Sequence, residues 1–209
     1  RGIYKAVSTI LTQVTVDPYD ESSYTPMKVV GRVMNAEEAK AEEAKGNFVV
    51  KEGDGYRRIV AAPKPVAIVE IDAIRALADA DQPVIAAGGG GIPVMEQGSH
   101  LKGASAVIEK DRAAGLLAKE LDADVLMFIT GVPNVVLNYG SDHPINIDKM
   151  TTADAARYAE EGHFKTGSML PKVESSIDFI NAGKGRRAII TSLDGAKSAL
   201  AGKGGTTIQ

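Results

Sequence analysis

Hydrophobic positions in the second half of the chain alternate between the spacing of buried strands and that of amphipathic helices. Apolar runs at residues 84–87, 125–130 and 187–192 predict strands, and the first of them is followed directly by glycine. Between residues 68 and 80, apolar positions three or four residues apart predict a helix that faces a core. Further helices are predicted at 112–121, 152–161, 171–182 and 195–200, and a further strand at 135–138. This alternation predicts an α/β fold: a three-layer sandwich with a mainly parallel central sheet.

The first sixty residues follow a different pattern. Residues 6–16 are rich in β-branched side chains and predict a strand, whereas residues 20–33 lack a regular apolar period and predict an extended loop. Residues 36–45 predict a short, highly charged helix, and residues 48–60 predict a β-hairpin. We therefore expect one domain over the whole chain, with a small protruding subdomain inserted at about residues 18–60.

Composition narrows the classes of function. The 209 residues carry a net charge of −3, which disfavours nucleic acid or an anionic membrane as the main partner. The chain has no cysteine, and its three histidines lack metal-ligand spacing, so we expect no zinc site. No apolar stretch reaches the roughly 18–20 residues that a membrane-spanning helix needs, so a soluble, cytoplasmic protein is the default expectation. The opening Arg1-Gly2-Ile3 runs almost directly into strand-like sequence, which suggests the interior of a longer protein.

Four consecutive glycines follow the apolar run at 84–87: Gly88, Gly89, Gly90 and Gly91. Glycine lets backbone N–H groups approach an anion closely because no Cβ stands in the way. The loop is not a Walker A motif, because no Gly-Lys-Ser/Thr follows, and it lacks the third glycine of a dinucleotide fingerprint. The alternative is a flexible tight turn. Since each glycine costs about 0.5–1 kcal/mol relative to alanine, we favour the anion cradle.

Two lysines lie in unusual settings. Lys110 lies between Glu109 and Asp111, just after an apolar run, where ligands bind in open α/β sheets; a solvated charge cluster at a helix start is the alternative. Pro171 near the first helical position puts Lys172 in the first turn, where the helix dipole disfavours a cation by about 0.3–1 kcal/mol. A lysine in this position suggests an anion at the same helix end, and a neutral surface lysine is the alternative.

Thr130 and Gly131 follow a buried strand and form a carboxyl-end loop suited to a nucleotide. As an isolated motif this dipeptide is only weakly specific.

The glycine loop, the segment 107–111 and the run 167–172 are together similar to segments of the carbamate kinases, members of the amino-acid-kinase fold group. Other matching segments, in the same order along the chain, are residues 10–18, 55–60, 63–65, 162–164 and 188–193. The matches span nearly the whole chain, and their number and order make the resemblance specific.

The resemblance implies reversible phosphoryl transfer between carbamoyl phosphate and ADP, giving ATP and carbamate with Mg2+. It implies that Lys110 and Lys172 neutralise the phosphate and that Asp111 holds them in place. The implied substrate-binding residues are Gly88, Gly89, Gly90, Gly91 and Lys28, and the implied nucleotide-binding residues are Thr130, Gly131, Met169, Pro171 and Lys172. No protein side chain is expected to be a dedicated metal ligand. The family also implies a homodimer.

Two departures from the family pattern stand out: Glu109 replaces the usual aspartate, and the family's opening Gly-Gly-Asn loop is absent from this chain. The alternatives are another acyl-phosphate kinase of the same fold, such as an acetylglutamate or aspartate kinase, and a non-catalytic nucleotide-binding or scaffold protein. The hairpin insert and the Ser-Met-Leu-Pro-Lys run disfavour the former. For a kinase, Lys110→Ala or Lys172→Ala is expected to reduce turnover by orders of magnitude with little loss of fold.

Overall fold

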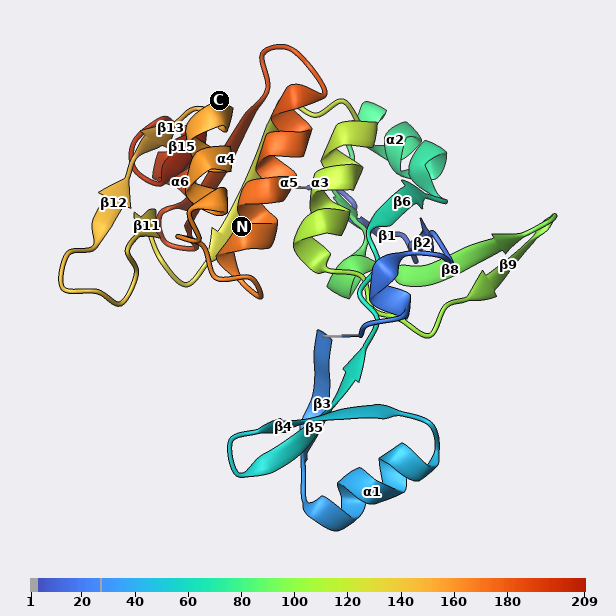
Figure 1. Ribbon diagram of the computed structural model, residues 1–209. Coiled ribbons are helices and arrows are strands. Elements are labelled where there is room, and N and C mark those ends of the chain that lie inside the picture. Colours follow the sequence, from blue (N-terminus) through green and yellow to red (C-terminus); the bar gives the residue numbers. More distant parts are fainter. Residues whose placement is uncertain (1–3, 27) are drawn as a thin grey trace. The chain divides into compact units, whose positions relative to one another are not determined.

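The computed structural model describes residues 4–26 and 28–209, so Arg1, Gly2, Ile3 and Met27 lie outside the described residues. The interpretation of the opening tripeptide and one position of the predicted loop fall on these residues. The chain divides into two compact units, Arg1–Lys110 and Asp111–Gln209. The boundary falls after the first residue of helix α3 (Lys110–Glu120) (Figure 1).

A four-stranded sheet forms the centre of the second unit. Its order is β10-β14-β15-β13, with bounds β10 (Val125–Thr130), β14 (Arg187–Ser192), β15 (Thr206–Ile208) and β13 (Lys149–Met150). β10 and β14 are parallel and cover the predicted spans residue for residue. β15 runs antiparallel to β14 and parallel to β13. The sheet therefore has its predicted parallel pair, extended by two short strands that the sequence pattern did not reveal.

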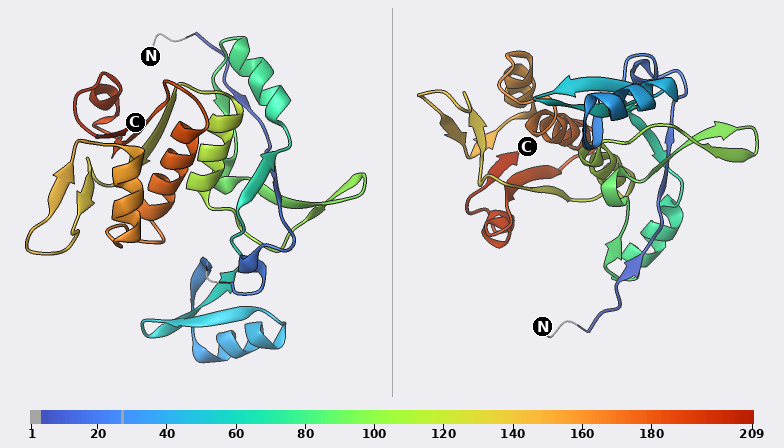
Figure 2. Two further views of the ribbon diagram at one scale, coloured as in Figure 1. Left: turned by 45° about the horizontal axis from the view of Figure 1, so that its top comes forward. Right: turned by 90° about the horizontal axis from the view of Figure 1, so that it is seen from below.

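Helices and a hairpin complete this unit. The helices are α4 (Thr152–Glu160), α5 (Met169–Asn181) and α6 (Ala196–Leu200), and the antiparallel hairpin is formed by β11 (Val135–Leu137) and β12 (Ile145–Ile147). Thr151 caps the start of α4, because its hydroxyl accepts a hydrogen bond from the Asp154 N–H at 3.0 Å. Figures 1 and 2 show the β11–β12 hairpin extending from one edge of the unit.

The core of the second unit lies between α5 and the sheet. Val173 and Phe179 of α5 pack with Phe128, Ile190 and Ile208, and all five are buried. Each such side chain contributes about 1.5–3 kcal/mol when fully buried. This packing fixes α5, and with it the first turn that carries Lys172.

The first unit contains a sheet of order β6-β2-β8-β9 and a separate parallel pair. The sheet strands are β6 (Pro65–Ile68), β2 (Gln13–Val16), β8 (Ile92–Gln97) and β9 (His100–Gly103), and the pair is β1 (Ser8–Thr9) with β7 (Val84–Ile85). β2 and β8 are parallel, whereas β6 and β9 join antiparallel at the two edges. Helix α2 (Ile71–Asp79) follows β6.

The predicted single strand at 6–16 is wrong in two respects, because pairing begins only at Ser8 and is interrupted at residues 10–12. The Ile10 N–H donates to the Ile85 carbonyl at 2.9 Å, whereas the Thr12 carbonyl accepts from the Ile92 N–H at 2.8 Å. Between them, the Thr12 hydroxyl donates to the Ile10 carbonyl at 2.9 Å and accepts from the Ala87 N–H at 2.8 Å. A local side-chain hydrogen bond thus replaces the ladder where the chain changes its partner strand.

A third sheet, of order β3-β5-β4, lies within the region predicted as an insert. Its strands are β3 (Lys28–Met34), β5 (Gly55–Val60) and β4 (Phe48–Glu52), accompanied by the 3-10 turn η1 (Glu21–Ser23) and helix α1 (Ala36–Ala44). The predicted helix and hairpin are therefore present. The loop predicted at 20–33 is wrong from Lys28 onward, because that segment pairs antiparallel with β5.

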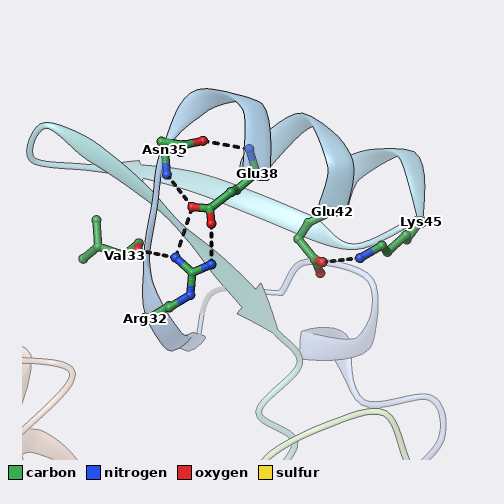
Figure 3. A network of polar contacts seen from close by, with 6 residues as sticks. All are labelled: Arg32, Val33, Asn35, Glu38, Glu42 and Lys45. Carbon is green, nitrogen blue, oxygen red and sulfur yellow. Dashed lines mark hydrogen bonds and ion pairs between the residues drawn. The ribbon is translucent and has the colours of Figure 1, made fainter.

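A capping box starts α1. The Asn35 side chain accepts from the Glu38 N–H at 2.9 Å, and the Glu38 carboxylate accepts from the Asn35 N–H at 3.0 Å (Figure 3). Arg32 also donates to this carboxylate, so the last part of β3 and the first turn of α1 are joined. These polar contacts stabilise a helix that has one buried residue, Ala39.

Two further expectations need correction. Ile68 was expected to begin a helix but is the last residue of β6, so the amphipathic helix starts at Ile71. The β8–β9 hairpin after the glycine loop was not predicted.

The α/β class is confirmed, because parallel strand pairs and covering helices occur as the alternating pattern required. The assignment of the whole chain to one domain with an insert stays a prediction.

Candidate functional site

Lys172 is the fourth residue of α5, and its ammonium group is buried against a carboxylate. Its Nζ donates to Asp111 Oδ2 at 2.8 Å and to the Ser168 carbonyl at 3.3 Å. Both charged side chains are only 7% exposed. Asp111 is the second residue of α3, so the contact joins the first turns of two helices. The anion expected near Lys172 is thus present within the chain itself.

Helix electrostatics favour one member of this pair and disfavour the other. The partial positive charge at a helix N-terminus stabilises Asp111 on α3 and opposes Lys172 on α5. A buried ion pair also loses hydration, and good geometry with additional hydrogen bonds must offset that loss. The Ser168 carbonyl supplies one such bond to Lys172. The pair therefore holds an ammonium group in a fixed position, which is the property that a phosphate-binding lysine needs.

A second group of charges surrounds Glu109, just before α3. Its buried carboxylate accepts from Lys28 Nζ and, at 3.3 Å, from Lys110 Nζ. Burial raises the pKa of Glu109, but the hydrogen bonds and charges of Lys28 and Lys110 outweigh it and lower the pKa below its ordinary value. The carboxylate is ionised at neutral pH and binds Lys28, which the resemblance assigned to the substrate, and Lys110, which it assigned to the phosphate.

Lys110 differs from Lys172 in its surroundings. The Lys110 side chain is 60% exposed, although its backbone begins α3. The peptide bond from Lys110 to Asp111 links the two groups of charges along the chain. Convergence of the Lys110 and Lys172 side chains on one phosphate stays a prediction.

The glycine loop forms a tight turn at Gly88–Gly90, in which Gly89 has non-helical backbone angles. Two of its glycines are required by packing. A Cβ on Gly90 would lie 2.2 Å from the Ile108 carbonyl oxygen, and a Cβ on Gly91 would lie 2.5 Å from Val14 Cγ2. A Cβ on Gly88 or Gly89 would meet nothing within 4 Å, although Gly89 has a positive φ of 68°. Hence neither packing nor φ explains why residue 88 is a glycine.

The predicted nucleotide residues all lie in the second unit. Thr130 ends β10 and pairs in register with Ser192 at the end of the parallel β14. Gly131 follows, and a Cβ there would meet nothing within 4 Å. Met169 is half-buried and packs against the core, whereas Pro171 is buried. Their contact with a nucleotide stays a prediction.

Sequence reasoning overlooked the loop after β14. Because the carboxyl ends of parallel strands meet at the same edge of a sheet, the residues after Ser192 lie beside the Thr130–Gly131 loop. Leu193 there is largely exposed. The signal was available in the sequence, since the strand at 187–192 had been recognised together with the one at 125–130.

Within residues 4–26 and 28–209, no group of three or more His, Asp or Glu side chains is placed to hold a metal ion. In the same part of the chain, no helix has the length and apolar character needed to span a membrane.

Comparison with known proteins supports the resemblance drawn from the motifs. The model of the amino acid kinase family matches residues 26–192. The chain is 48% identical over 210 aligned residues to the carbamate kinase-like protein YqeA of Escherichia coli and 47% identical to a carbamate kinase of Clostridium perfringens. In both cases the alignment covers 100% of this chain and 67% of the relative.

A solved structure gives the same result. Carbamate kinase of Giardia lamblia bound to AMP-PNP superposes with a TM-score of 0.88 at 40% identity, over 96% of this chain and 64% of that one. The chain thus spans about two thirds of the length of the proteins it matches. These comparisons confirm the resemblance and the fold that it implied.

Proposed function

The chain belongs to the amino acid kinase family, and from this premise we propose that the protein containing it is a carbamate kinase. It transfers a phosphoryl group reversibly between carbamoyl phosphate and ADP, giving carbamate and ATP. The observation that carries the proposal is the buried Lys172–Asp111 pair at the first turns of α5 and α3. The substrate class is supported by relatives named carbamate kinase that align with the entire chain.

Phosphoryl transfer requires positioning and charge neutralisation more than covalent chemistry. Lys172 suits this role because its ammonium group has three N–H donors, and Asp111 and the Ser168 carbonyl accept two of them. The third donor serves a phosphoryl oxygen. Lys110, partly exposed and hydrogen-bonded to Glu109, supplies a second positive charge, and Lys28 on the same carboxylate binds the substrate.

Gly88, Gly89, Gly90 and Gly91 line the carbamoyl phosphate side in this proposal. Gly88 supports it most directly, since the space next to its Cα is open and its φ is not positive. Gly90 and Gly91 contribute by allowing the loop to pack closely on Ile108 and Val14.

ATP or ADP binds at Thr130, Gly131, Met169, Pro171 and Lys172. The open space next to Gly131, at the carboxyl end of β10, fits the close approach of a nucleotide. Mg2+ accompanies the nucleotide, because this ion is commonly held by substrate phosphates, water and one or two carboxylates. That mode of binding suits a site whose nearby carboxylates, Glu109 and Asp111, are paired with lysines.

The protein is further proposed to be a homodimer, on the strength of the resemblance alone, and the cytoplasmic location stays a prediction. A role in arginine metabolism is one setting for the reaction, and the sequence leaves purine breakdown open as another.

A coupled assay on the full-length protein tests the proposed reaction. We expect ATP from ADP and carbamoyl phosphate, and much lower rates with acetyl phosphate, N-acetylglutamyl phosphate or aspartyl phosphate as donors. Lys110→Ala should lower kcat by orders of magnitude, about 10²-fold or more, because it removes a charge at the transferring group. Lys119→Ala, an exposed lysine on the same helix, is the matched control and should retain wild-type kcat.

Preference for another acyl phosphate would assign the protein to a different kinase of the same fold. Nucleotide binding without turnover of any donor would favour the non-catalytic alternative.

A further inference from the structure

α3 and α5 approach each other closely at a single glycine. A Cβ added to Gly115 of α3 would lie 2.8 Å from Ser175 Cβ, 3.3 Å from the Ser175 carbonyl oxygen and 3.4 Å from Ser175 Cα. Gly115 and Ser175 are both buried. Since Ser175 Cβ is bound directly to the backbone, it cannot rotate away, and any side chain at position 115 must push the helices apart.

The glycine contact lies one turn from the Lys172–Asp111 pair. Asp111 precedes Gly115 by four residues and Lys172 precedes Ser175 by three, so each pair shares one helix face. Figures 1 and 2 show α3 and α5 as neighbouring helices. The distance between the two helices at Gly115 therefore determines how closely the Asp111 carboxylate and the Lys172 ammonium group can approach each other.

A surface ion pair accompanies this contact. Arg112 donates to Glu174 Oε2 at 2.7 Å, and both residues follow closely on the members of the buried pair. The side chains of Arg112 and Glu174 are partly exposed, so this pair contributes little by itself. It does orient the same two helix turns.

Helix propensity gives no reason for glycine at position 115. In the interior of an α-helix, glycine is less favourable than alanine, so Gly115→Ala would stabilise α3 if nothing packed against it. Close approach to Ser175 is the compensating feature. Packing and propensity therefore predict opposite outcomes for the same substitution.

We propose that Gly115 is a positioning residue for the proposed phosphoryl transfer. Its missing side chain lets α3 approach α5 until the Asp111 carboxylate holds the Lys172 ammonium group in place. This inference rests on the proposed function for its kinetic consequence. Its structural consequence, the burial of Lys172, is independent of any activity.

The test compares Gly115→Ala, Ser175→Gly, the double variant and wild type in the full-length protein. Misplacement of a catalytic group by a fraction of an ångström to an ångström lowers rates by about tenfold to a hundredfold, so we expect kcat of Gly115→Ala to fall in that range with KM for carbamoyl phosphate nearly unchanged. Adding Ser175→Gly removes the closest of the three contacts and should restore part of kcat. Gly103→Ala, where a Cβ meets nothing within 4 Å and φ is not positive, is the matched control.

Two further measurements separate positioning from general damage. In an Asp111→Asn background, Gly115→Ala should cause little additional loss of kcat, because the contact on which it acts is already weakened. Acylation of lysines by acetic anhydride, followed by mass spectrometry, should modify Lys172 faster in Gly115→Ala than in wild type, with Lys119 as the internal reference.

Wild-type kcat and unchanged Lys172 labelling in Gly115→Ala would overturn the proposal, as would an equal loss of kcat in the Asp111→Asn background. If Gly115→Ala fails to fold, the double variant takes its place, and failure of Ser175→Gly to restore folding would also contradict it. A wild-type protein without kinase activity would instead refute the proposed function, and the labelling comparison would still decide the role of Gly115.

Discussion

Lys110 and Lys172 carry the same charge, but the Lys110 side chain is exposed and the Lys172 side chain is buried. Removing each lysine should therefore change the stability of the fold by a different amount. Lys172→Met removes one member of the buried Lys172–Asp111 ion pair, which is expected to cost about 3–5 kcal/mol of stability. Lys110 is 60% exposed, so Lys110→Met should change stability by less than about 1 kcal/mol. Urea unfolding of both variants measures the two free energies. We therefore still expect little loss of stability when Lys110 is removed, but a large loss when Lys172 is removed.

The control for this comparison removes both charges. Lys172→Met combined with Asp111→Leu should recover most of the lost stability, because two apolar side chains then replace the whole buried ion pair. Equal destabilisation by the two single lysine substitutions would contradict the assigned burial.

The sequence showed which single residues are unusual more readily than it showed which residues they contact. Lys172 attracted attention as a cation in the first turn of a helix, and the inference of a nearby anion was sound. The anion is Asp111, however, 61 residues away along the chain. Helical periodicity located α3 and α5, although it put both starts two residues late, at 112 and 171 instead of Lys110 and Met169, and it did not show that their first turns touch. The close packing of Gly115 against Ser175 was unpredictable for the same reason.

The first turn of α1 shows how an element with almost no apolar face is held, and its stability should depend on pH. The hydrogen bond from Arg32, together with that from the Asn35 N–H, lowers the pKa of Glu38 from 4.5 to about 2 (Figure 3). Because the pKa is depressed in the folded state, this contribution is fully present above pH 4.5 and is lost as the pH falls towards 2. Hydrogen-exchange protection of the α1 amides, corrected for intrinsic rates, should therefore fall between about pH 5 and pH 2.

Glu38→Gln should flatten that pH dependence and lower α1 protection at neutral pH. Glu43→Gln, at an exposed glutamate of the same helix, should leave both unchanged. A pH profile that is identical in wild type and Glu38→Gln would show that other groups control this turn.

Elements were predictable where burial imposes a long, uniform pattern. β10 and β14 were recognised residue for residue, because parallel strands covered on both faces have nearly continuous apolar sequences. β3 was overlooked because Gly31 and Arg32 interrupt its apolar run, where its register with β5 also shifts. β13 and β15 have two and three residues, too few for a period to be detected. Strand 6–16 was overextended because its composition does not reveal the change of partner at Thr12.

At the scale of the whole molecule, the proposed ligand residues divide by unit. All of the substrate residues, Lys28 and the glycines 88–91, lie in Arg1–Lys110, and all of the nucleotide residues lie in Asp111–Gln209. The boundary falls between Lys110 and Asp111, two of the three proposed catalytic residues. Each ligand should therefore stabilise a different part of the chain.

Hydrogen exchange of the full-length protein with one ligand at a time tests this division. At a ligand concentration of about 100 times Kd, binding stabilises the folded state by about 2.7 kcal/mol, and amides that exchange by local opening of the bound segment gain protection up to that amount. ADP with Mg2+ should protect the ends of β10 and β14 and the first turn of α5, whereas a non-reactive carbamoyl phosphate analogue should protect the glycine loop and the residues before α3. The β11–β12 hairpin contains no proposed ligand residue and serves as the internal reference. If ADP protected the glycine loop as strongly as it protects β10, the assignment of the two ligands to separate units would be wrong, even if the kinase activity itself were observed.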